Sequence, residues 1–202
     1  MSAYSIVDIP GWENLSLNAA DRAELDRRID ELAHGSVPDE VPRDTATPFR
    51  QEVRKHLARL VDQARVAGAG LLCIPTQRMG DMAIPASYTV SEWRDVERDE
   101  VAPAALLESL AADSSATVTF VDVDGQPALR EEDIEAAASD ADPLATHDGR
   151  RVTYTVSAPD DPRGWVVFSF ITLGDGDPRG ALADLLVELF DAQLTTLRWR
   201  QT

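Results

Sequence analysis

Two segments decide the fold: Arg151–Ser157, with the sequence RVTYTVS, and Trp165–Thr172, with the sequence WVVFSFIT. In the first segment apolar and polar side chains alternate, which predicts a strand with one face in the core and one toward solvent. The second segment is apolar on both faces, which predicts a central strand of a sheet. Only residues 158–164 separate the two, and 159–164 are expected to turn the chain, so we expect antiparallel strands joined by a turn.

Three further segments have strand patterns. Leu71–Ile74 is apolar on both faces and predicts another central strand, Ala86–Trp93 alternates, and Thr117–Val123 ends at the turn signal Asp124-Gly125. Strands joined by turns predict a mostly antiparallel sheet. Residues 131–138 are ambiguous, but their acidic start followed by alanines favours the first turn of a helix.

Helical periodicity and capping residues predict four helices, two of which precede the first predicted strand. Their expected bounds are Asn18 or Ala19 to Ala33, Pro48 to about residue 67 with Thr47 as the cap, Ala102 to Ala112, and about Ala181 to Leu197 after the capping residue Asp177. The predicted fold class is therefore α+β, a mostly antiparallel sheet flanked by helices, with two N-terminal helices. We expect a single domain over residues 1–202, with a helical part of about 1–68 and a sheet-containing part of about 69–202.

The chain is strongly acidic, with 36 acidic and 19 basic side chains among 202 residues and a formal charge of −17. Such a charge argues against binding to nucleic acid or anionic lipid, because both are polyanions. The segment Asp95–Asp148 holds 15 acidic and 2 basic residues. This segment predicts either a solubilising surface or a face for a protein partner with a basic surface, and a mimic of nucleic acid is a third possibility.

The location of the protein is predicted from patterns that the sequence lacks. The first residues have neither the basic nor the apolar region of a secretory signal, and no apolar run is long enough for a membrane span. We therefore expect a cytoplasmic protein without membrane insertion. The single cysteine, Cys73, lies within an apolar segment and is expected to be a small buried side chain.

Motifs for catalysis, phosphate binding and metal binding are absent from the sequence. His34, His56 and His147 are widely separated, which makes a three-histidine metal site improbable. The glycine-rich segment 174–180 follows a strand, but its two aspartates place negative charge where a phosphate would sit. We therefore predict no catalytic residues, no metal site and no cofactor.

The candidate protein-binding residues come from three places. The segment 77–82 combines arginine, glycine and two methionines, which suits an adaptable contact surface, and Trp93 at a strand end suits an interface anchor. The acidic residues 131–133 suit a basic partner. The predicted binding residues are Arg78, Met79, Asp81, Met82, Trp93, Glu131, Glu132 and Asp133.

Several segments also resemble a known family. They are Phe49–Val53, Ala67–Leu71, Ile84–Val90, Trp165–Thr172, Leu185–Ala192 and Thr196–Trp199. They look like segments of a family of uncharacterised proteins from high-GC Gram-positive bacteria, often encoded near type VII secretion genes. The C-terminal end is also similar to the Mog1/PsbP-like fold, an antiparallel sheet between helices. This resemblance implies a binding or assembly factor and carries over no functional residue.

These observations predict a non-enzymatic, cytosolic protein-binding or accessory module associated with type VII secretion. An alternative is an immunity or inhibitor protein that neutralises a basic toxin. An enzyme with a dispersed site is a further alternative, which would require a pocket with converging polar groups. The sequence predicts neither the partner's identity nor the oligomeric state.

Overall fold

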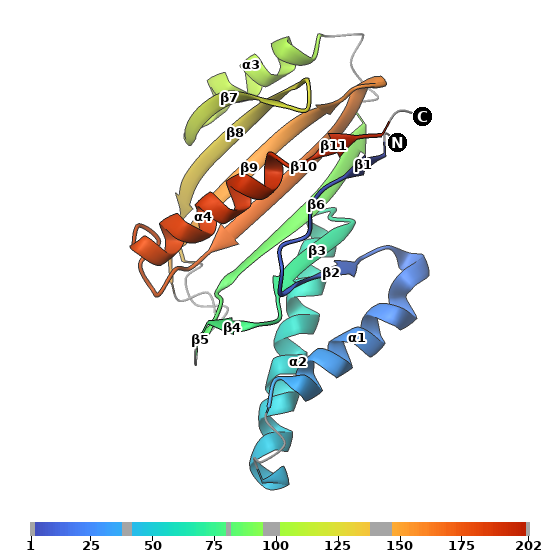
Figure 1. The fold of residues 1–202 in the computed structure, drawn as a ribbon, viewed down its shortest axis with the longest axis vertical. Coiled ribbons are helices and arrows are strands. Elements are labelled where there is room, and N and C mark those ends of the chain that lie inside the picture. Colours follow the sequence, from blue (N-terminus) through green and yellow to red (C-terminus); the bar gives the residue numbers. More distant parts are fainter. Residues whose placement is uncertain (1–2, 38–41, 80–81, 95–101, 138–146, 201–202) are drawn as a thin grey trace.

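The computed structural model describes residues 3–37, 42–79, 82–94, 102–137 and 147–200. It is an α+β fold with a large antiparallel sheet and four α-helices in the described part of the chain (Figure 1). The predicted α+β class is therefore confirmed.

Seven strands form the large sheet in the order β2-β3-β6-β10-β9-β8-β7. Their bounds are Trp12–Ser16 (β2), Leu71–Pro75 (β3), Ala86–Arg94 (β6), Thr117–Val123 (β7), Gln126–Glu135 (β8), Gly149–Ala158 (β9) and Asp161–Thr172 (β10). Strands β3 and β10 each have a neighbour on both sides, which confirms both as central strands. Strands β9 and β10 are antiparallel neighbours, with Tyr154 opposite Phe168.

The described residues also form two small two-stranded sheets and the helices. Tyr4–Ser5 (β1) pairs with Arg198–Trp199 (β11), and Arg78–Met79 (β4) pairs with Met82–Ala83 (β5). The helices are Arg22–Gly35 (α1), Arg43–Val66 (α2), Pro103–Asp113 (α3) and Ala181–Leu194 (α4), and a 3-10 turn at Ala19–Asp21 precedes α1. Within the described residues, no helix has both the length and the apolar character that crossing a bilayer requires.

Helix α4 covers one face of the large sheet (Figure 1). Phe190 of α4 is fully buried, and its ring stacks on Phe170 of β10 with 4.9 Å between ring centroids. Burial of one such aromatic side chain stabilises a fold by about 2–3 kcal/mol. The strand alternation places Cys73 on this face, and its side chain is buried as predicted.

The opposite face is covered at two separate places. Near β2 and β3, helices α1 and α2 pack on Leu15 and Leu72. Near β8, helix α3 packs through Leu107 on Leu129 and Trp165. The same alternation that directs Cys73 toward α4 directs Leu72 toward α1 and α2, because successive side chains of a strand point to opposite faces.

The N-terminal part differs from the sequence-based expectation at two places. The sequence pattern indicates no element at residues 12–16, yet β2 pairs with β3 along its whole length. Helix α2 begins at Arg43 and has Pro48 inside it, whereas a start at Pro48 was expected. The N–H that Pro48 lacks would have bonded the carbonyl of Asp44 in the first turn of α2, so the proline costs the helix one backbone hydrogen bond near its start.

Two predictions in the C-terminal half are also wrong. Residues 131–135 belong to strand β8 and do not begin a helix, because all five residues pair with β9 and residues 131 and 132 also pair with β7. Helix α4 ends at Leu194 and its N-cap is Gly180. Asp177 instead accepts a hydrogen bond from the amide of Arg179 at 2.9 Å, and so closes the turn before the helix.

Candidate functional site

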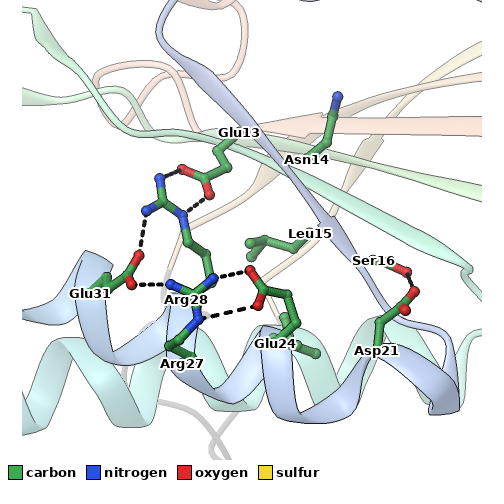
Figure 2. Close-up of a pocket in the computed structure, with 10 residues that line it drawn as sticks. Glu13, Asn14, Leu15, Ser16, Asp21, Glu24, Arg27, Arg28 and Glu31 are labelled. Carbon is green, nitrogen blue, oxygen red and sulfur yellow. Dashed lines mark hydrogen bonds and ion pairs between the residues drawn. The ribbon is translucent and has the colours of Figure 1, made fainter.

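The candidate site is a cleft at one edge of the large sheet, between β2 and α1 (Figure 2). The chain leaves β2 at Ser16, turns through the 3-10 segment and returns as α1 alongside the strand. The hydroxyl of Ser16 donates a 2.6 Å hydrogen bond to Asp21, which ties the turn to the end of the strand. The cleft has a volume of about 330 Å³ and is lined by Glu13, Asn14, Leu15, Ser16, Asp21, Glu24, Leu25, Arg27, Arg28 and Glu31.

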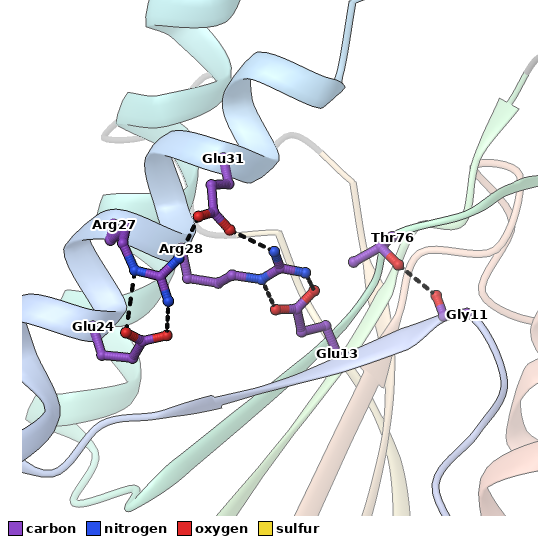
Figure 3. A network of polar contacts seen from close by, with 7 residues as sticks. All are labelled: Gly11, Glu13, Glu24, Arg27, Arg28, Glu31 and Thr76. Atoms are coloured by element: carbon purple, nitrogen blue, oxygen red, sulfur yellow. Dashed lines mark hydrogen bonds and ion pairs between the residues drawn. The ribbon is translucent and has the colours of Figure 1, made fainter.

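A row of alternating charges crosses this cleft from α1 to β2 (Figure 3). Arg27 binds Glu24, with 3.2 Å from Nε to Oε2, and also binds Glu31. Arg28 donates to Glu31 at 2.6 Å and reaches Glu13 of β2 with two guanidinium nitrogens. The four residues of α1 in this row are three or four positions apart, which places them on one flank of the helix. We call these five residues, Glu24, Arg27, Glu31, Arg28 and Glu13, the charge row.

The charge row begins and ends on a carboxylate. Hydrogen bonds to Glu13 and then to Glu31 raise the pKa of Arg28, and the hydrogen bond from Arg28 lowers the pKa of Glu31. The whole lining of the cleft has four carboxylates and two guanidinium groups, a formal excess of two negative charges. Because most of these charged side chains are exposed, the ion pairs among them add little to stability.

Four of the predicted binding residues lie at the two ends of β6. Arg78 and Met79 form β4, and Met82 begins β5, in a small hairpin next to the start of β6. Trp93 lies near the other end of β6, is 40% exposed, and stacks on Trp165 with 5.8 Å between ring centroids. Asp81 lies outside the described residues. The structure therefore does not bring the hairpin and Trp93 together.

The acidic residues 131–133 are divided between the two faces of β8. Glu132 points to the α4 side, where it binds Arg130 at 2.7 Å and Arg150 at 2.6 Å. Glu131 and Asp133 occupy the other face, where Asp133 binds Arg151 at 2.8 Å. These three carboxylates therefore do not form one surface, and parts of the acidic segment 95–148 lie outside the described residues. Their role in partner binding stays a prediction.

Glu132 is instead part of an ion-pair chain that fastens α4 to the sheet. On one side Arg130 binds Asp191 of α4 at 2.9 Å, and on the other Arg150 binds Asp184 of α4. Burial acts to raise the pKa of Glu132, but hydrogen bonds from the two arginines outweigh it and lower the pKa. We call these five residues, Asp191, Arg130, Glu132, Arg150 and Asp184, the helix clamp.

The sequence pattern does not reveal the cleft between β2 and α1, because it does not reveal β2. The strand has only five residues, and its alternation rests on Leu15 with the nearby Leu17, too short a pattern to stand out. The spacing of Glu24, Arg27 and Glu31 on a predicted helix was a readable signal of a charged flank. Only the folded chain places Glu13 opposite that flank.

Neither a protein-family model nor a curated protein sequence matches the chain. Among the residues that the structure describes, no three His, Cys, Asp or Glu side chains are grouped so that they could hold a metal ion.

Proposed function

We propose that the protein is a non-catalytic binding module for a protein partner with a basic surface, and that the partner binds at the edge cleft. The observation that carries this proposal is the excess of carboxylates over guanidinium groups in the cleft of a chain with a formal charge of −17. A net charge of this size raises the rate at which a basic partner meets the protein, and a local excess directs where it docks.

The carboxylates of the charge row retain the capacity to bind a partner although they are already paired. A carboxylate accepts about four hydrogen bonds through its two oxygens. Among the residues that the structure describes, Glu24 receives its hydrogen bonds from Arg27 and Glu13 receives its hydrogen bonds from Arg28. Lysine or arginine side chains of a partner would therefore add to these pairs without breaking them.

The proposal extends to a cellular role. The resemblance to proteins encoded near type VII secretion genes, together with the Mog1/PsbP-like fold that we propose for the large sheet and its helices, supports an accessory factor acting in the cytoplasm. An inhibitor of a basic toxin would use the same chemistry. The partner's identity separates the two roles, because a secretion component supports the first and a toxin supports the second.

The test is to isolate the partner with the tagged full-length protein and to measure its affinity for two double variants. Glu24→Gln with Glu31→Gln removes two charges from the cleft, and we expect binding about fivefold weaker. Glu108→Gln with Asp113→Asn removes two charges from the exposed surface of α3 and serves as the matched control. Thermal unfolding checks that both variants fold.

Two results would contradict the proposal. One is equal affinity loss in the cleft variant and the α3 variant, which would mean that only the overall charge matters. The other is partner binding that does not weaken with added salt, because a charge-directed interface is screened by ions.

A further inference from the structure

The outer edge of β2 presents backbone groups that no neighbouring strand uses in the described structure. The amide of Leu17 donates to the carbonyl of Gly70 at 2.9 Å, and the amide of Thr76 donates to the carbonyl of Gly11 at 2.8 Å. In an antiparallel pair the hydrogen-bonded positions alternate, so the odd-numbered residues of β2 bond to β3. The amides and carbonyls of Asn14 and Ser16 therefore point away from β3, toward the open edge.

The edge cleft lies along this row of backbone groups. Asn14, Leu15 and Ser16 line it on the strand side, and α1 lines it on the other (Figure 2). A free strand edge beside a helix provides what strand addition requires, namely unpaired backbone groups for affinity and a side wall that selects side chains.

We propose that an extended, lysine- or arginine-bearing segment of the partner adds to the outer edge of β2 as a further strand of the large sheet. This inference rests on the proposed function and specifies how the partner binds. Alternate side chains of an added strand point to the same face. One set would therefore face α1, where Glu24 and Glu31 lie, and a basic residue at every second position would match the carboxylate excess.

The first experiment follows amide hydrogen exchange by NMR while a short capped peptide, in which lysine alternates with threonine, is added to the full chain. In the free protein we expect the amide of Leu15 to exchange slowly and the amides of Asn14 and Ser16 to exchange fast. With the peptide bound, we expect exchange at Asn14 and Ser16 to slow at least tenfold and that at Leu15 to change little. The amides of β7, at the other edge of the sheet, are the internal control.

The second experiment uses matched peptides and variants. A peptide with the same charges but N-methylated alternate amides cannot add as a strand, and we expect it to bind at least tenfold more weakly. Asn14→Pro removes one outward amide without removing a bond to β3, whereas Asn14→Ala keeps that amide. We expect the proline variant to lose peptide binding and the alanine variant to retain it. If the proline variant fails to fold, the exchange data and the N-methylated peptide decide.

The outcomes separate this inference from the proposed function. Equal binding of both peptides with no protection at Asn14 and Ser16 would overturn strand addition and leave a charge-directed site in place. Failure of the lysine peptide to bind would also overturn strand addition. In that case, a loss of partner binding in the double variant Glu24→Gln with Glu31→Gln would still support the proposed function. Protection of the β7 amides alone would place the added strand at the wrong edge and overturn the inference.

Discussion

Replacing Asp191 by asparagine should release one end of the helix clamp. Asp191 accepts two hydrogen bonds from Arg130, at 3.1 and 2.9 Å, and a third from the hydroxyl of Tyr154 at 2.9 Å. Asparagine keeps one acceptor oxygen but loses the negative charge and the two-pronged contact with Arg130. Arg130 would then keep a single ionic partner, Glu132.

The magnitude follows from the burial of the pair. Removing one partner of a fully buried ion pair costs about 3–5 kcal/mol. The side chain of Arg130 is 15% exposed and that of Asp191 is 32% exposed, so solvent screens part of the loss. Because Arg130 also keeps Glu132 at 2.7 Å, we expect a loss of about 2 kcal/mol in the free energy of unfolding. For a chain of this size that corresponds to a fall in Tm of about 5 °C.

Urea unfolding followed by circular dichroism measures this change, with Asp184→Asn as the matched control. Asp184 lies at the other end of the helix clamp but is 56% exposed, so we expect its variant to lose only about 0.5 kcal/mol. The reasoning is refuted if the two variants lose the same stability, since burial would then not govern the strength of the clamp.

Three further predictions concern single side chains. The lowered pKa of Glu132 means that its ion pairs stabilise the fold above about pH 4.5, and that this stability is lost as the pH falls through the lower folded-state pKa. Urea titrations at a series of pH values should therefore show a smaller loss of stability at acid pH in Glu132→Gln than in the unchanged protein. Burial raises the pKa of Cys73 to about 11, so at about pH 8 an alkylating reagent should label the thiol only after urea is added, as read by mass spectrometry. Trp93→Ala should uncover the buried Trp165, cost about 1.5 kcal/mol in urea unfolding and shift the tryptophan emission to the red.

Each of these predictions has an outcome that contradicts it. An unchanged acid limb in Glu132→Gln would show that the helix clamp is not linked to protonation. Rapid labelling of Cys73 in the folded protein would show that β3 opens readily. An emission spectrum unchanged in Trp93→Ala would show that the ring of Trp93 does not shield Trp165.

The sequence predicted those strands whose pattern is long and clear. Segment 151–157 alternates between apolar and polar side chains, and segment 165–172 is apolar on both faces. Both segments are strands, and they are antiparallel neighbours in the large sheet as expected. It failed where the local pattern was short or conflicting. Residues 131–135 have the composition of a helix start, but they pair with β9 along their whole length and with β7 at residues 131 and 132, and that gain exceeds the local preference.

The sequence by itself determined the α+β class, the central positions of β3 and β10, the burial of Cys73 and the strong negative charge, because periodicity and composition are local properties. Only the tertiary structure decided that residues 12–16 form an edge strand, that Glu13 completes the charge row of α1, and that Glu131 and Glu132 face opposite ways. An edge, a cleft and an ion pair between distant residues depend on which elements become neighbours, and that is fixed by packing of the whole chain.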